Sequence, residues 1–294
     1  MTDRNQEHNF KNHSMEYNNS RPRTWIGKLL TAIAFTLLGI ALLPLGLVIT
    51  YVIYKGASRF NLALFTELPP AALQEGGGIA NAIVGTLVLV GIAALIAIPI
   101  GVLAGIYLSE FSSRKVYGFI SFMNNVLSGV PSIIMGVFAY GVIVLTTNTY
   151  SAYAGGFALA ILMLPIVVRT TYEALQIVPQ EVRWASAGVG ASNFHTVLKI
   201  VLPAALPAIL TGTTLAVARA AGETAPLLFT VLFTQFWPQD LIGPYPSLSV
   251  LIYRYATVPY QAQNELAWAA SLILVLLILL TSIISRWATR KSIY

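Results

Sequence analysis

The chain has 294 residues, of which 56% are hydrophobic and only 10% are charged. Soluble domains usually carry about 25% charged residues, so this composition argues against a soluble protein. The sequence contains no cysteine, which excludes disulfides, thiol nucleophiles and cysteine metal sites, and its formal net charge is +6.

The N-terminal residues 1–24 are polar, rich in Asn, His and Arg, and show no hydrophobic periodicity. We predict a disordered cytoplasmic tail there. The apolar stretch that follows is too long for a signal-peptide core and is interpreted as a retained anchor. The remaining residues, 25–294, are predicted to form one transmembrane domain.

Six apolar stretches approach the roughly 20 residues that a membrane-spanning helix needs. They cover residues 25–54, 79–108, 116–146, 155–172, 203–233 and 265–286. The sequence therefore predicts an all-α, polytopic membrane protein with six transmembrane helices.

The distribution of basic residues predicts the orientation of these spans. If the N-terminus is cytoplasmic, the opposite side of the membrane holds only Lys55, Arg59 and Arg254. By the positive-inside rule, both termini are then cytoplasmic. The positive net charge is interpreted as a topology signal and not as a nucleic-acid surface.

The motifs of common enzymes are missing from the chain. His8, His13 and His195 all lie outside the predicted spans, and there is no His-Glu-x-x-His, Gly-x-Ser-x-Gly or Gly-x-x-x-x-Gly-Lys-Ser/Thr sequence. We therefore predict no catalytic residue, no metal site and no cofactor. Any energy source is expected to come from a partner.

The loop between the fourth and fifth predicted spans has the strongest local signals. Pro179 disfavours helix in the residue before it, so one helix ends there and a short helix can start at Gln180. Gly188 and Gly190 are expected to stop that helix. Either Ser192 or Asn193 caps a second short helix, and Pro203 suits the first turn of the fifth span.

Apolar side chains stand out on these two short helices, which are expected at the cytoplasmic mouth. Trp184, Phe194 and Leu198 would be exposed there. Exposed aromatic residues on a short loop favour a docking surface, with a solvated connector as the alternative.

Two charged residues interrupt the fifth apolar stretch near its middle. Arg219 and Glu223 lie four residues apart, so on a helix they would share a face and could pair. A charge at the bilayer centre costs roughly 2.5–3.5 kcal/mol even on lenient insertion scales. We therefore expect this face to look into a polar path or a partner subunit.

The loop resembles the cytoplasmic coupling motif of ABC importer permeases. Gly190, Ile200, Leu202 and Pro203 fall at the spacing of the family's Glu-Ala-Ala, three residues, Gly, nine residues, Ile-x-Leu-Pro motif. Trp184, Ala185 and Ser186 stand where Glu-Ala-Ala would be, so the motif glutamate is missing, and Glu181 is the nearest substitute. The resemblance implies a coupling helix that contacts an ATPase subunit.

A finer resemblance is to permease subunits of bacterial phosphate importers, and it covers nearly the whole chain after residue 25. It rests on Glu75-Gly-Gly-Gly78, on Gly129-Val-Pro131-Ser132 and above all on Arg219-Ala-Ala-Gly-Glu223-Thr-Ala-Pro-Leu-Leu228. The family implies an inner-membrane location within the lipid bilayer, a homologous second permease, two cytoplasmic ATP-binding subunits and an extracytoplasmic phosphate-binding protein. No nucleic-acid partner is implied.

The resemblance adds a functional interpretation of the intramembrane pair. Arg219 offers planar donors to phosphate oxygens, and Glu223 would keep the anion from being held too tightly. The alternative is a structural ion pair that locks two helices together. Thr224 either lines the same path or bonds its own backbone turn.

Three alternatives stay open at this point. The substrate could be another oxyanion, such as sulfate or molybdate. The chain could also be a membrane scaffold or sensor subunit that transports nothing. The aromatic outer segment, residues 234–264, is either an interfacial belt or a docking surface for the binding protein.

Overall fold

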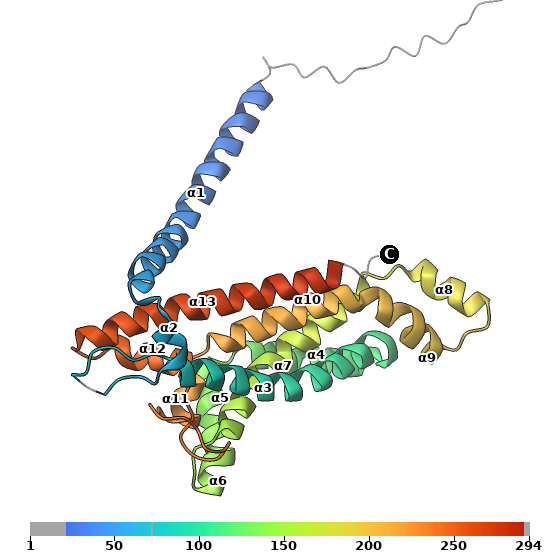
Figure 1. The fold of residues 1–294 in the computed structure, drawn as a ribbon. Coiled ribbons are helices and arrows are strands. Elements are labelled where there is room, and N and C mark those ends of the chain that lie inside the picture. Colours follow the sequence, from blue (N-terminus) through green and yellow to red (C-terminus); the bar gives the residue numbers. More distant parts are fainter. Residues whose placement is uncertain (1–21, 72, 291–294) are drawn as a thin grey trace, which may run out of the picture. The chain divides into compact units, whose positions relative to one another are not determined.

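The structure, a computed structural model, describes residues 22–71 and 73–290, and every regular element in those ranges is a helix (Figure 1). Contacts divide the chain into two units, residues 1–51 and 52–294. The described part of the first unit belongs to α1 (Pro22–Gly56), an apolar helix with exposed side chains. Of the predicted tail, residues 22–24 begin this helix, and the rest lies outside the described residues.

Within the described ranges, five helical segments are long and apolar enough to cross a membrane, and a bent helix pair makes a sixth if it is one span. The first is α1. The others are α3 (Ala80–Ile106), which continues as the π-helical turn η2 (Tyr107–Phe111), α7 (Ala152–Gln176), the segment from α9 to α10, and α13 (Gln261–Arg290). The predicted all-α fold of a polytopic membrane protein is confirmed.

The third predicted span consists of two helical segments. The first is α4 (Arg114–Gly129), and the second runs from α5 (Ser132–Ala139) through η3 (Tyr140–Val144) to α6 (Leu145–Thr147). The two segments are bent by 98°. Pro131 lies at the bend and forces Val130 before it into an extended backbone. The helix is therefore broken at this proline.

The fifth span is shifted from the predicted range of 203–233. One continuous helix runs from Asn193 to Ala221, through α9 (Asn193–Thr196), the π-helical turn η4 (Val197–Val201) and α10 (Leu202–Ala221). Pro203 lies in the first turn of α10, as predicted, but the span itself begins earlier than predicted, at Asn193. Pro203 cannot donate a backbone hydrogen bond, and the π turn directly before it lets the helix continue. After a break, α11 (Ala225–Thr230) follows.

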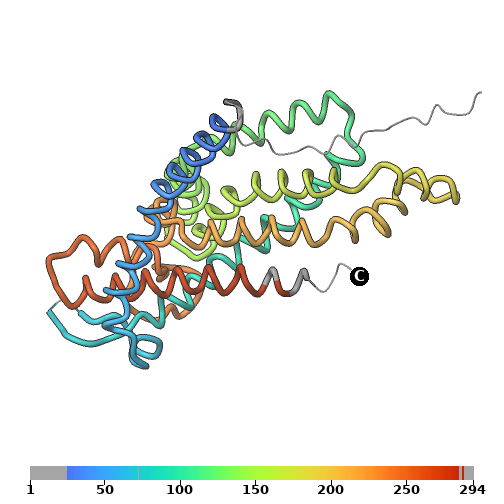
Figure 2. Tube along the Cα trace, turned by 90° about the horizontal axis from the view of Figure 1, so that it is seen from above, coloured from blue at the N-terminus to red at the C-terminus, as the bar shows by residue number. Residues whose placement is uncertain are grey.

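Helices α3, α7, α10 and α13 run side by side in the second unit, as both views show (Figures 1 and 2). Small residues allow their close approach. A Cβ added at Gly101 of α3 would lie 2.8 Å from the Cβ of Val167, and one at Gly105 would lie 2.6 Å from the Cβ of Thr171. These two glycines therefore allow α3 and α7 to pack closely.

The two ends of this unit carry different short elements. One end carries α8 (Gln180–Gly188) and α9, and we call it the α8 end. The other, the α12 end, carries η1 (Ala57–Arg59), α2 (Leu62–Thr66) and α12 (Leu248–Ala256).

Tyr255 organises the interior of the α12 end. Its ring is buried, and its hydroxyl accepts a hydrogen bond of 2.9 Å from Gln235 Nε2. The same Gln235 group donates to the carbonyl of Pro70. Burial raises the pKa of the Tyr255 phenol, so it remains neutral and binds three chain segments together.

Candidate functional site

The intramembrane pair predicted from the sequence is present, but it does not lie within one helix. Arg219 is in the last turn of α10, and Glu223 follows the C-cap residue Gly222. Arg219 Nε and Glu223 Oε1 are 3.7 Å apart. The Arg219 side chain is 60% exposed and that of Glu223 is 17% exposed. The expectation that one helix face carries both charges near the middle of a span is therefore wrong.

At the break after α10, hydrogen bonds hold the backbone of Glu223, while the side chain of Arg219 remains exposed. The Glu223 amide donates to the carbonyl of Ala220, and the Glu223 carbonyl accepts a hydrogen bond of 2.9 Å from Ser249 Oγ on α12. Thr224 then opens α11 with its carbonyl, which accepts from Leu227 and Leu228. The Thr224 side chain is half-buried and makes no capping bond. The result is a Glu223 backbone held at both its amide and its carbonyl, beside an exposed guanidinium.

The predicted short helices at the α8 end are present and begin where predicted. The first is α8, and Gly190 follows it with φ of +85°, which is a left-handed backbone that favours glycine. Ser192 Oγ accepts a hydrogen bond from the His195 amide and so caps α9. The second helix differs from the prediction because it does not end before the span.

The apolar side chains expected at the surface of this end are exposed. Trp184 is 65% exposed and Phe194 is 62% exposed. Glu181 and Ala185 are exposed on the same short helix, α8. Ile200 and Leu202 are half-buried and Pro203 is exposed, all within the continuous helix, so the later part of the coupling motif is helix and not loop.

The inward side of α8 carries contacts that the sequence did not predict. Arg183 forms an ion pair with Glu110 of η2, and the two side chains are only 14% and 9% exposed. A second Arg183 nitrogen, Nη2, donates to the carbonyl of Leu175 at 2.8 Å. Ser186 Oγ and Thr196 Oγ1, both buried, are 2.8 Å apart and join α8 to α9.

A second arginine–glutamate pair with the same spacing lies on α7. Arg169 Nε donates to Glu173 Oε1 at 2.8 Å, and both side chains are more than half exposed. The pair lines a cavity of about 210 Å³ together with Asn124, Asn125 and Tyr172. This polar cavity lies between α4 and α7.

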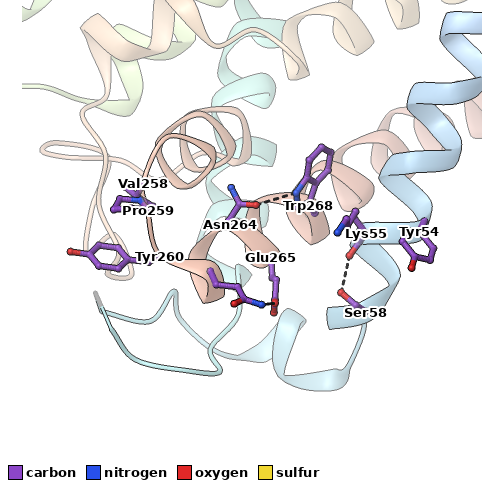
Figure 3. A pocket seen from close by; sticks show the side chains of 10 residues that line it. Tyr54, Lys55, Ser58, Val258, Pro259, Tyr260, Asn264, Glu265 and Trp268 are labelled. Carbon is purple, nitrogen blue, oxygen red and sulfur yellow. Dashed lines mark hydrogen bonds between the residues drawn. The ribbon is translucent and has the colours of Figure 1, made fainter.

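The α12 end contains a wider cleft of about 600 Å³ (Figure 3). Its walls come from the end of α1, the turn before α13 and the first turns of α13, and they include Tyr54, Tyr260 and Trp268. Beside the cleft, Arg59 Nε donates to Glu265 Oε2 at 2.9 Å. This contact ties η1 to α13. Among the described residues, no group of three or more His, Asp or Glu side chains could hold a metal ion.

Comparisons with known proteins agree with this architecture. Residues 97–294 match the family described as binding-protein-dependent transport system inner membrane component. The phosphate transport system permease protein PstA of Yersinia pestis is 43% identical over 233 residues, which is 79% of each chain. Its counterpart in Haemophilus influenzae is 42% identical over 260 residues, or 88% of this chain and 92% of the relative.

Two solved structures share the fold at low sequence identity. The methionine ABC transporter MetNI in an inward-facing conformation has a TM-score of 0.63 and 21% identity, and the match covers 74% of this chain and 96% of that chain. A bacterial alginate ABC transporter has a TM-score of 0.61 and 13% identity over 92% of this chain and 95% of that chain. With most of its length matched to both the family and its relatives, the chain belongs to the binding-protein-dependent transport system inner membrane components and, within them, to the proteins named phosphate transport system permease PstA.

Proposed function

We propose that this chain is the membrane-spanning permease subunit of an ATP-driven importer that moves inorganic phosphate into the cell. Its partners are a homologous second permease, two cytoplasmic ATP-binding subunits and an extracytoplasmic phosphate-binding protein. ATP is hydrolysed on the ATP-binding subunits. Both termini and the α8 end face the cytoplasm in this proposal, and the α12 end faces the binding protein.

The observation that carries the proposal is the setting of Arg219 in a chain that is 43% identical to a phosphate permease. A permanent cation at the end of a membrane-spanning helix, more than half exposed, suits an anion that must pass. The guanidinium offers several N–H donors to phosphate oxygens. Glu223 lies close enough to compete for the guanidinium, so the anion is bound favourably but released.

The exposed apolar side chains of the α8 end support the coupling role. Trp184 and Phe194 present aromatic surface that a monomer would ordinarily bury. Gly190, Ile200, Leu202 and Pro203 keep the family spacing, and Glu181 is exposed on α8 near the position of the missing motif glutamate. We assign this surface to docking on an ATP-binding subunit.

Radiolabelled phosphate uptake in cells that lack this chain tests the transported substrate. Reintroducing the chain restores high-affinity uptake, and unlabelled sulfate or molybdate in excess does not compete. If either oxyanion competes, that anion and not phosphate would be the assigned substrate. If the complex assembles again but takes up no phosphate, the chain would instead be a scaffold or sensor subunit.

Crosslinking tests the docking surface, because the chain has no cysteine of its own. Trp184→Cys and Phe194→Cys are expected to crosslink to single cysteines on the ATP-binding subunit, with a yield that changes with nucleotide. Leu215→Cys, on an exposed part of α10, is the control that gives no such crosslink. No crosslink from either test position in an active complex would remove the docking assignment.

A pair of glycine variants tests the link between the two short helices. Gly188 and Gly190 both have open space where a Cβ would lie, but only Gly190 has a positive φ. Gly190→Val is expected to lower uptake and uncouple ATP hydrolysis from the binding protein, because a β-branched residue resists that backbone. Gly188→Val is the matched control and keeps both activities near wild type. Equal behaviour of the two variants would contradict the coupling role of Gly190.

A further inference from the structure

Polar side chains attach the short helix α8 to the rest of the molecule. Its inward side holds Arg183 and the buried Ser186, while Trp184 and Glu181 are exposed. An amphipathic helix normally buries its large apolar side chains. The exposed Trp184 is therefore left for a partner.

Arg183 makes the central contact of this attachment. Its guanidinium meets Glu110, which belongs to η2 at the end of α3, and also donates to the carbonyl of Leu175 near the end of α7. Glu110 accepts a further hydrogen bond of 2.8 Å from Ser109, and Gln176 donates to Ser109 at 3.0 Å. One network, with the Arg183–Glu110 pair at its buried centre, thus joins the ends of α3 and α7 to α8.

The strength of this contact follows from its burial. An ion pair with less than a sixth of either side chain exposed is screened little by water, and removing one partner leaves an uncompensated buried charge. The exposed Arg169–Glu173 pair, in contrast, resembles the surface pairs that contribute little.

Helix α8 is connected to α7, α10 and α3 by different types of contact. Residues 177–179 join it directly to α7, and a Ser186–Thr196 hydrogen bond joins it to α9, which continues into α10. No covalent segment near α8 leads to α3. Within the described residues, the Arg183–Glu110 ion pair joins α8 to the end of the α3 segment, and the Gln176–Ser109 hydrogen bond joins α7 to it.

We propose that Arg183 and Glu110 are positioning residues that make α8 rigid with respect to the α3–α7 pair, so that movement of a docked ATP-binding subunit drives both helices. Without the pair, α8 would turn about residues 177–179, and the movement would reach α10 alone. This inference rests on the proposed docking of α8.

The first test compares uptake with ATP hydrolysis in the assembled complex. Arg183→Gln and Glu110→Gln are expected to lower phosphate uptake about tenfold, the order of a typical coupling free energy between two sites, while ATP hydrolysis stays within about twofold of wild type. The exchanged variant, Arg183→Glu with Glu110→Arg, recovers more than half of the lost coupling, and Arg183→Lys recovers part. Arg114→Gln, an exposed arginine at the same end, is the matched control with unchanged activity.

The second test measures rigidity without reference to the transported anion. Spin labels are placed at Ala187→Cys on α8 and Leu103→Cys on α3, both at exposed positions. In an otherwise unchanged complex, one narrow distance distribution is expected with and without ATP. With Arg183→Gln, the distribution broadens and shifts when ATP is added.

Three results would overturn the inference. Uptake within twofold of wild type in both Gln variants would do so, as would an unchanged label distance in Arg183→Gln. A loss of uptake and ATP hydrolysis in equal proportion, with no recovery in the exchanged variant, would reduce the pair to a structural anchor. Failure of the proposed function would instead appear as missing phosphate uptake in the wild-type complex.

Discussion

Two arginine–glutamate pairs with identical spacing lie on neighbouring helices, and their settings differ. Arg169 and Glu173 lie within α7, their side chains are 2.8 Å apart, and both are more than half exposed. Arg219 and Glu223 lie on the two sides of the helix end at Gly222, are 3.7 Å apart, and only the arginine is exposed. The same four-residue spacing therefore gives two different electrostatic arrangements.

The difference shows what a helix end adds to a charged pair. In α7 the two side chains meet in hydrogen-bond geometry, so each satisfies the other. After α10 the chain leaves the helix, and Ser249 holds the Glu223 backbone to α12. Arg219 then faces a carboxylate at a longer distance, on a residue whose backbone is held in place, and this arrangement suits exchange of that carboxylate for a passing anion.

Replacing the two arginines should give the largest contrast. Arg219→Gln is expected to lower phosphate uptake at least roughly tenfold, because a charge-assisted hydrogen bond is worth about 1.5–3 kcal/mol. Arg169→Gln should lower it no more than about fivefold, because exposed pairs contribute only about 0.2–1 kcal/mol. Uptake by complexes of equal yield is the measurement. Equal losses in the two variants would remove the distinction between the pairs.

A double-mutant cycle sharpens the same comparison. Glu223→Gln should impair uptake on its own, and adding it to Arg219→Gln should cause little further loss, because the two residues act as one unit. Glu173→Gln with Arg169→Gln is the matched cycle and should show nearly additive, small effects. Strict additivity at Arg219 and Glu223 would mean that they work independently.

A smaller effect, on stability, is expected from a substitution at the contact between α7 and α10, the helices that carry the two arginines. A Cβ added at Gly212 of α10 would lie 2.4 Å from the Cβ of Thr170 on α7. Gly212→Ala should therefore destabilise the complex by about 1–3 kcal/mol through overpacking. Gly222→Ala is the control, because its Cβ would meet only the Arg219 carbonyl, at 3.7 Å. Thermal unfolding of the detergent-solubilised complex measures both, and equal midpoints would contradict the close-approach argument.

Hydropathy was sufficient to predict the helical class and the membrane spans, but not the ends of the fifth span. The residues of α11 are as apolar as those of α10, so the apolar stretch continues across the break at residues 222–224. At the other end, Lys199 and His195 look like loop residues, although the helix already begins at Asn193. Hydropathy reports the environment of a segment and not the continuity of its backbone hydrogen bonds.

The candidate sites also differ in how far they can be predicted from the sequence. Some depend on neighbouring residues, and others depend on residues far apart in the chain. Gly190 and the Ser192 cap depend on neighbouring residues, so sequence spacing was enough to predict them. The Arg183–Glu110 pair joins residues 73 positions apart, and each looks like an ordinary charged residue at the end of a span. Only their burial distinguishes them, and no pattern in a single sequence reports it.

The unbroken helix from Asn193 to Ala221 has a geometric consequence for transport. Its 29 residues, at 1.5 Å each, make a rod roughly 43 Å long with Phe194 at one end and Arg219 at the other. A rotation of this rod by about 5° around the Phe194 end displaces the Arg219 end by about 4 Å, on that rise per residue. This displacement exceeds the length of a hydrogen bond, about 3 Å. A tilt too small to disturb helix packing is thus enough to bring the guanidinium into contact with an anion or to withdraw it.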